Sequence, residues 1–369
     1  MDDRLFSFKQ KSQDFIVTEE LPFNLANEGD VFFVFFEKRN LNTMDVVHHL
    51  CTAFNLSRLS LGIAGLKDKK AITRQWICIY KSALKKLWGE KAFLESLGEI
   101  AKVMKTWRHT TPIWMTTPIK NSFYIRLRAN KKLSEKEKDI SNRKILNLCK
   151  KWFPNVFWNQ RFGIEGKNPQ QGSDILQGKL KLQDKKDTVF KIQAYASKIF
   201  NEYAHTRTNK WLHILDGDII IDIESAKGKQ FGIYQAKTNT IKLFDDTKKE
   251  EIFFHYPKQG GKEVPFNAEN MLVSWPVIGY NLLLAPKESI AGGKEQGLLE
   301  KNHISEKSLK LCKEYKIFGI RRPIWVFPQR VSVHFQGDDI LLNFTLPSWS
   351  YASIMIDELE KTVWVVNIG

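Results

Sequence analysis

The chain has 369 residues, of which 43% are hydrophobic and 12% aromatic, so it can form two packed domains and is too apolar to be disordered. Lys and Arg outnumber Asp and Glu by 57 to 41, and this formal net charge of +16 favours a polyanionic partner, of which nucleic acid is the commonest. No apolar run of about 20 residues is present to span a bilayer, and the acidic start does not predict a signal peptide.

The first 60 residues predict two strands and a helix. Residues 15–19 alternate between apolar and polar types, and residues 31–36 are a continuous apolar run suited to a central strand. An amphipathic helix is predicted over residues 42–54, capped by Asn and Thr. On composition alone, Lys9 is an exposed charge at a strand edge and Phe15 an ordinary core ring.

A short, highly charged loop lies between two further predicted strands, residues 61–64 and 75–80. It holds one carboxylate, Asp68, among the cations Lys67, Lys69, Lys70 and Arg74. Nearby cations favour the ionised form of a carboxylate, and a carboxylate attacks carbon only when it is deprotonated. The loop is therefore either the site of a nucleophile or a surface turn whose charges pair with one another, and the residues alone leave both readings open.

The remaining elements follow from periodicity and turn residues. Residues 84–105 predict an amphipathic helix, and Ser134-x-x-Glu137 is a capping-box pattern that predicts the start of another. The Gly- and Gln-rich residues 166–172 predict a linker. Strands are also predicted at 121–128, 324–327, 331–335 and 340–344, with a hairpin turn at 336–339 and a helix at 351–359.

The four cysteines lie far apart in apolar segments: Cys51, Cys78, Cys149 and Cys312. This spacing predicts reduced core residues of a cytoplasmic protein, with neither disulfides nor a metal site.

Several motifs resemble those of the TruD family of tRNA pseudouridine synthases. Residues 65–76, which read Gly-Leu-Lys-Asp-Lys-Lys-Ala-Ile-Thr-Arg-Gln-Trp, resemble the family's Gly-x-Lys-Asp loop. Residues 154–163 resemble its Asn-Tyr-Phe-Gly-x-Gln-Arg-Phe-Gly, and residues 346–353 its Leu-Pro-x-Gly-Ser-Phe-Ala-Thr. Lys9 and Phe15 fit the N-terminal pattern, a Lys before an Asp-Phe pair and a Val-x-Glu. The sequence departs from the family at Val156, where the family has Tyr, at Trp158 and Trp349, where it has Gly, and at Tyr351, where it usually has Phe.

The resemblance implies a role for each matching residue. Asp68 would be the catalytic nucleophile, with Lys9 beside it. The residues that would bind the uracil are Phe15, Asn155, Phe157 and Tyr351. We expect RNA contacts from the cations Lys67, Lys69, Lys70, Arg74 and Arg161.

The resemblance also implies an α+β fold with two domains. A pseudouridine-synthase-type catalytic domain, with a mixed or antiparallel sheet flanked by helices, would comprise residues 1–177 and 323–369. An inserted α/β TRUD domain would comprise residues 178–322. The implied reaction is the isomerisation of a tRNA uridine, number 13 in the D-arm, to pseudouridine without a cofactor or metal. We expect tRNA as the partner, no membrane association and a monomer.

Two alternatives remain open from the sequence. The first is a non-catalytic RNA-binding or tRNA-chaperone protein on the same scaffold, which the replacements Val156, Trp158 and Trp349 keep in consideration. The second is a pseudouridine synthase that acts on another RNA.

Overall fold

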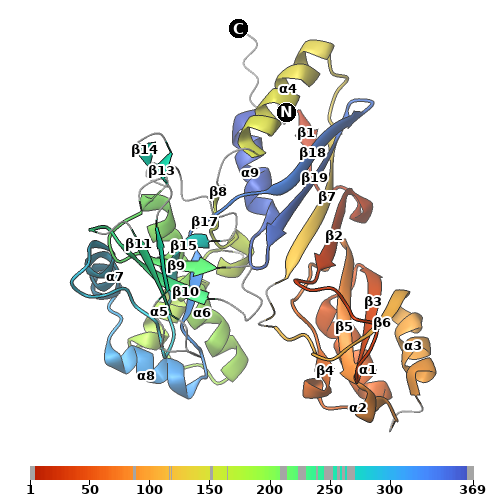
Figure 1. Cartoon of the computed structure of the whole chain (residues 1–369), viewed down its shortest axis with the longest axis horizontal. Coiled ribbons are helices and arrows are strands. Elements are labelled where there is room, and N and C mark those ends of the chain that lie inside the picture. Colours follow the sequence, from red (N-terminus) through yellow and green to blue (C-terminus); the bar gives the residue numbers. More distant parts are fainter. Residues whose placement is uncertain are drawn as a thin grey trace. The chain divides into compact units, whose positions relative to one another are not determined.

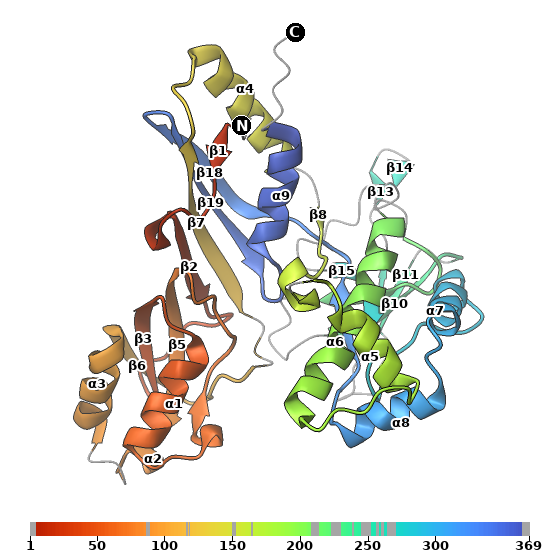
Figure 2. The ribbon, with the colours of Figure 1, turned by 180° about the vertical axis from the view of Figure 1, so that it is seen from behind.

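The computed structural model describes the chain except residues 1–4, 86–88, 116, 118, 150–152, 164, 208–213, 223–229, 238–239, 245–251, 256–257, 260–261, 264–270 and 364–369. The chain divides into two compact units (Figures 1 and 2). Unit 1 comprises Met1–Lys151, Phe327–Ala352 and Ile356–Gly369, and unit 2 comprises Trp152–Val326 with Ser353–Met355. The predicted α+β class is confirmed, whereas the proposed limits of a catalytic and an inserted domain stay a prediction.

Unit 1 is built on a nine-stranded sheet with the order β18-β19-β7-β2-β5-β3-β6, in which β1 also pairs with β7 and β4 with β5. The strands are β1 Phe6–Ser7, β2 Phe15–Glu20, β3 Val31–Arg39, β4 Leu61–Gly62, β5 Ile72–Tyr80, β6 Lys102–His109, β7 Lys120–Ala129, β18 Gln329–Gln336 and β19 Asp339–Pro347. The sheet is mixed because β2 and β5 run parallel, while the ladders of β7 with β2 and β19 are antiparallel.

The helices of unit 1 are α1 Thr43–Ala53, α2 Lys81–Lys85, α3 Gly89–Ile100, α4 Glu135–Cys149 and α9 Ala352–Val363. Phe32, Val34 and Phe36 of β3 pack against α1 and α3 in one apolar cluster. Val31 and Phe33, which point to the other face of the sheet, belong to a second cluster. Both faces of β3 are therefore buried, which confirms that its continuous apolar run forms a central strand. In Figures 1 and 2, α4 and α9 lie beside β18 and β19.

The predicted helix over residues 84–105 is wrong in its last part. Helix α3 ends at Ile100, and the chain then forms β6, which pairs antiparallel with β3. Pairing with β3 satisfies the backbone N–H and C=O groups of this segment, so tertiary structure overrides the local helical periodicity.

The predicted linker at residues 166–172 is also wrong, because helix α5, Asn168–Leu176, begins within it. Pro169 lies in the first turn of α5, where a missing backbone N–H costs no helical hydrogen bond. Gly172 lies against α6, Lys185–Thr206, and a Cβ on this glycine would be 2.1 Å from the carbonyl oxygen of Lys191. The Pro and Gly here mark a helix start and a close helix contact.

Unit 2 contains a six-stranded antiparallel sheet with the order β12-β11-β10-β9-β15-β16. Its elements are β8 Phe153–Pro154, β9 Ile219–Asp222, β10 Gln230–Gln235, β11 Thr240–Phe244, β12 Ile252–His255, β13 Lys258–Gln259, β14 Lys262–Glu263, β15 Met271–Val277, α7 Ile290–Lys301, α8 Glu306–Glu314, β16 Ile320–Pro323 and β17 Trp325–Val326, with α5 and α6. A buried ion pair lies inside this unit, with the Arg321 Nη1 atom 2.6 Å from Glu295 Oε1.

Within the described part of the chain, no helix combines the length and apolarity that a membrane crossing requires. All four cysteines are free thiols. Cys78, Cys149 and Cys312 are buried, as the sequence predicts, whereas Cys51 is half-buried.

Candidate active site

The charged loop between β4 and β5 is held by its neighbours through Lys67. The backbone N–H of Lys67 donates to Thr43 Oγ1 over 3.0 Å, and the Thr43 hydroxyl in turn donates to Gln75 Oε1 over 2.9 Å. The Lys67 ammonium lies 2.8 Å from Glu19 Oε2, and the two side chains are only 6% and 0% exposed. Lys67, one of the cations expected to contact RNA, therefore forms a buried ion pair inside unit 1.

Lys38 contacts the same loop from β3. Its side chain is fully buried, and Nζ donates to the carbonyl oxygens of Leu41 over 2.6 Å and of Asp68 over 3.1 Å. Burial lowers the pKa of Lys38 to about 8, although the negative charge of Asp68 acts in the opposite direction. The peptide that carries Asp68 is thus bonded to a group without solvent access.

The side chain of Asp68 points in the opposite sense, toward solvent and Lys9. Lys9 Nζ donates to Asp68 Oδ2 over 2.8 Å, and the carboxylate remains 54% exposed. The same ammonium lies 4.0 Å from the centre of the Phe15 ring. The structure therefore brings Lys9, Asp68 and Phe15 together, as an accessible carboxylate held by a cation that also covers an aromatic ring.

Phe15 continues an aromatic row through the sheet. Its ring meets Phe8 edge-on at 5.5 Å and Phe123 at 6.0 Å, and Phe123 stacks on Phe344 at 5.2 Å. Phe8 and Phe15 thus form an apolar surface beneath Lys9, and Phe123 and Phe344 extend it.

The other cations expected to contact RNA differ in their surroundings. Lys69 and Lys70, which follow Asp68, are exposed. Arg74 Nε lies 2.9 Å from Glu37 Oε2, so this arginine is paired. Arg161 lies in unit 2, where it donates to Ser197 Oγ over 3.3 Å and to Gln193 Oε1 over 3.4 Å.

Two of the residues expected to bind uracil, Asn155 and Phe157, also belong to unit 2. The Asn155 amide is buried, accepting from Arg322 Nη2 over 2.9 Å and donating to the Pro323 carbonyl over 3.0 Å. The Arg322 guanidinium lies 4.1 Å from the centre of the Phe157 ring. The structure thus gathers Asn155 and Phe157 around Arg322, within a unit that does not contain Asp68.

Tyr351 lies in unit 1, half-buried and directly before α9. The nearby Trp349, at a family glycine position, has φ +69°, the left-handed conformation that glycine adopts without steric cost. Trp158, at the other family glycine position, has φ −73° and ψ 154°, an extended conformation that any residue adopts. Replacement of glycine is therefore strained at residue 349 and unstrained at residue 158.

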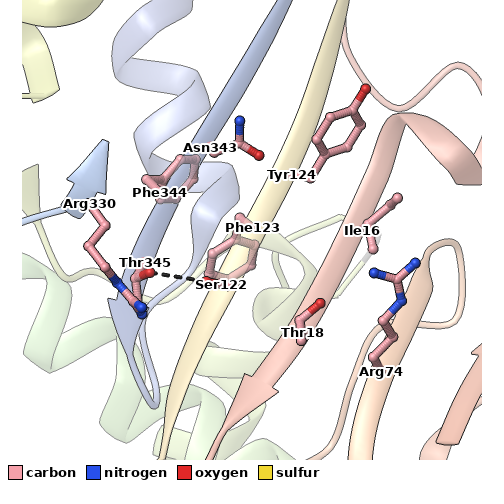
Figure 3. Close-up of a pocket in the computed structure, with 10 residues that line it drawn as sticks. All are labelled: Ile16, Thr18, Arg74, Ser122, Phe123, Tyr124, Arg330, Asn343, Phe344 and Thr345. Carbon is pink, nitrogen blue, oxygen red and sulfur yellow. Dashed lines mark hydrogen bonds between the residues drawn. The ribbon is translucent and has the colours of Figure 1, made fainter. Parts of the chain in front are cut away.

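A pocket of about 400 Å³ lies against β2, β7 and β19 of the unit 1 sheet (Figure 3). Its lining residues are Ile16, Thr18, Arg74, Ser122, Phe123, Tyr124, Arg330, Asn343, Phe344 and Thr345. Thr18, Ser122 and Thr345 form a row across β2, β7 and β19. Ile16 and Thr18 point away from the face that carries Phe15, because side chains alternate along a strand. Two of the lining cations are paired, Arg74 with Glu37 and Arg330 with Glu20.

Sequence reasoning missed the residues that hold the loop, namely Glu19, Lys38 and Thr43. For Lys38 a signal was present, because it continues the series Phe32, Val34 and Phe36 at a spacing of two, which places it on a buried face. Glu19 is likewise on the buried face of its strand, in register with Phe15 and Val17. In the described residues, no group of three or more His, Cys, Asp or Glu side chains is placed to hold a metal ion.

Comparison with known proteins agrees with these motifs. The sequence pattern of the family described as tRNA pseudouridine synthase D (TruD) matches residues 5–182 and 170–359. The chain is 30% identical to tRNA pseudouridine synthase D of Wolinella succinogenes, over 96% of this chain and 94% of that protein. It is 28% identical to the protein of the same name from Histophilus somni, over 95% and 93%.

The fold also resembles a crystal structure assigned to TruD from Methanosarcina mazei, with a TM-score of 0.58. This similarity covers 98% of the present chain and 94% of the other at 18% sequence identity, so it concerns the fold alone. The sequence pattern of the family covers nearly the whole described chain. This match is a comparison of sequences and does not depend on the structural similarity. The chain belongs to the TruD family of tRNA pseudouridine synthases.

Proposed function

We propose that this chain converts a tRNA uridine, U13 in the D-arm, to pseudouridine, with Asp68 as the nucleophile. The observation that carries the proposal is the Asp68 carboxylate, half exposed and bonded at 2.8 Å to Lys9 beside the Phe15 ring. A nucleophilic carboxylate must be accessible to its substrate and fixed in direction, and this arrangement provides both.

The chemistry needs only a nucleophile and proton transfer. The bond between N1 of uracil and C1′ of ribose breaks, the uracil rotates, and a bond forms between C5 and C1′. The hydrogen on C5 is lost as a proton and N1 gains one, so substrate and product are isomers. No oxidant, reductant or second substrate is required. Asp68 would start the reaction by attacking either C1′ of the ribose or the uracil ring, and Lys9 would orient the carboxylate.

Binding must take the uridine out of its stack, which costs a few kcal/mol. Stacking on an aromatic ring returns roughly 1–3 kcal/mol per base. Phe15, Asn155, Phe157 and Tyr351 stay our predicted uracil-binding residues. The exposed Lys69 and Lys70 beside the nucleophile are suited to contact phosphates.

The test is in vitro modification of unmodified tRNA transcripts, with pseudouridine mapped by chemical labelling and primer extension. We expect one new pseudouridine, at position 13 of the D-arm. Asp68→Asn is expected to retain tRNA binding and lose turnover, whereas Asp139→Asn, which changes an exposed carboxylate on α4, is the matched control.

Residual activity of Asp68→Asn above about a tenth of wild type would count against the nucleophile, since such a residue supplies far more than tenfold in rate. Tight tRNA binding with no pseudouridine anywhere would instead support a non-catalytic RNA-binding protein. Modification confined to other RNAs would keep the reaction and change the substrate.

A further inference from the structure

We propose that Lys38 is a positioning residue for Asp68, which holds the peptide of the nucleophile in place from inside the protein. This inference rests on the proposed function and extends it to a residue that does not touch the substrate.

The geometry places one ammonium between two segments. Lys38 lies near the end of β3, with its side chain fully buried. It donates to the carbonyl oxygen of Leu41, just before α1, and to that of Asp68 in the loop. Asp68 is thereby bonded at both ends: Lys38 holds its backbone oxygen, and Lys9 holds its carboxylate.

Burying the Lys38 ammonium is costly, which argues that the residue does more than fill space. A buried ammonium is costly unless it is paired with an opposite charge. Among the described residues, Lys38 forms no ion pair within 4.0 Å, and its two acceptors are neutral carbonyls. The charges that act on it are those of Asp68, Lys67 and Asp45, and burial dominates by lowering its pKa. An apolar side chain of equal length would avoid the cost of burying a charge but would leave both carbonyl oxygens without this donor, so what the lysine supplies is the pair of hydrogen bonds that fixes the loop.

Lys38 also complements the anchors of the preceding residue. The bonds from Lys67 to Thr43 and Glu19 fix the chain one residue before the nucleophile. Without Lys38, the Asp68 carbonyl loses this buried partner and the peptide after Lys67 can rotate. A displacement of about 1 Å at a reacting group can cost on the order of 100-fold in rate.

The experiment compares Lys38→Met, which keeps length and apolar packing, with Lys136→Met, an exposed lysine of α4. Single-turnover rate, tRNA dissociation constant and thermal unfolding are measured on the full chain. We expect Lys38→Met to lower the rate by at least about tenfold. Its dissociation constant should stay within about threefold of wild type. Its melting temperature should change little, because relief from burying a charge offsets the loss of two hydrogen bonds. Lys38→Arg, which keeps the charge and the donors, should recover part of the rate.

A second measurement keeps the test decisive if Lys38→Met does not fold. The wild-type rate should fall above about pH 8, because Lys38 loses its charge there and its hydrogen bonds to the two carbonyl oxygens weaken. In Lys38→Arg, on the same tRNA, this fall should move to higher pH, because arginine keeps its charge.

The inference is overturned if Lys38→Met reacts at the wild-type rate, or if Lys38→Arg leaves the pH profile unchanged. It is also overturned if melting temperature and tRNA affinity fall together with the rate, because that pattern indicates a structural role. Each of these three results can occur while wild type is active and Asp68→Asn is inactive, in which case the proposed function survives. A wild-type chain inactive on every tRNA would overturn both.

Discussion

Lys9 and Asp68 are 59 residues apart in the sequence, yet Lys9 Nζ lies 2.8 Å from Asp68 Oδ2. Lys9 adopts φ +56°, an unfavourable conformation for a residue with a Cβ atom. With side chains 28% and 54% exposed, the pair contributes little to stability. We therefore expect the pair to act through the direction that it imposes on the carboxylate.

Replacing Lys9 tests that direction. Lys9→Met should lower the single-turnover rate by about 10- to 100-fold, because the carboxylate loses its orienting partner. Affinity for tRNA should change by less than about threefold, since one partly covered charge is removed. Lys11→Met, an exposed lysine two residues away, is the control. Equal rates for the two variants would show that the pair has no part in catalysis.

The exposed lysines after Asp68 should contribute to binding through phosphate contacts. Replacing both Lys69 and Lys70 with Ala should weaken tRNA binding and reduce the slope of log K against log salt concentration by about 1.5–2, the effect of two phosphate contacts. Filter binding at several salt concentrations measures this slope, with Lys136→Ala as control. A slope equal to that of wild type would exclude both lysines from the RNA interface.

Stability should depend on pH through Lys38. The pKa of Lys38 is about 8 in the folded chain, and in the unfolded chain it takes the ordinary lysine value of 10.5. Between these two pH values the unfolded chain therefore binds more protons than the folded chain. The free energy of unfolding should therefore rise as pH increases through this window, by on the order of 1.4 kcal/mol per pKa unit of difference, and this contribution is lost as pH falls through 8. Urea unfolding at pH 7.5 and about 10, compared between wild type and Lys38→Met, isolates the contribution. The same pH dependence in both proteins would refute it.

The buried pair of unit 2 provides a stability test away from the site. Glu295→Ala leaves the Arg321 guanidinium, 1% exposed, without its carboxylate, and should lower the free energy of unfolding by about 3–5 kcal/mol. Glu314→Ala, at an exposed position of α8, should have little effect. Replacing both Glu295 and Arg321 with Met should restore most of the loss. Thermal unfolding that is unchanged in Glu295→Ala would show that the pair is not coupled to folding.

Two helical glycines are predicted to respond oppositely to alanine. Gly172→Ala should destabilise the protein by about 1–3 kcal/mol, because its Cβ would lie 2.1 Å from a backbone oxygen of α6. Gly297→Ala, in α7 with open space around the position, should stabilise it by up to about 1 kcal/mol through higher helix propensity. Chemical denaturation measures both, and a gain in stability for Gly172→Ala would contradict the tight packing of α5 on α6.

The sequence by itself was sufficient for much of the fold. Four features depend only on residues close together in the sequence. They are the alternation in β2, the continuous apolar run of β3, the capped start of α1 and the hairpin between β18 and β19. The Asp68 loop was likewise visible as one contiguous motif, and the family resemblance in several such motifs. Local rules failed at β6 and α5, where pairing with β3 and contact with α6 determine the outcome.

Only the tertiary structure decided which charges of the candidate site are available. Lys67 and Lys69 look alike in the sequence, yet Lys67 is buried on Glu19 whereas Lys69 is exposed. Lys38, unremarked in the sequence, bonds the backbone of Asp68 from a buried position. The physical reason is that an ion pair or a buried hydrogen bond joins segments brought together by strand register and loop path. The local pattern states which residues carry charge, and the folded chain determines which partner each charge meets.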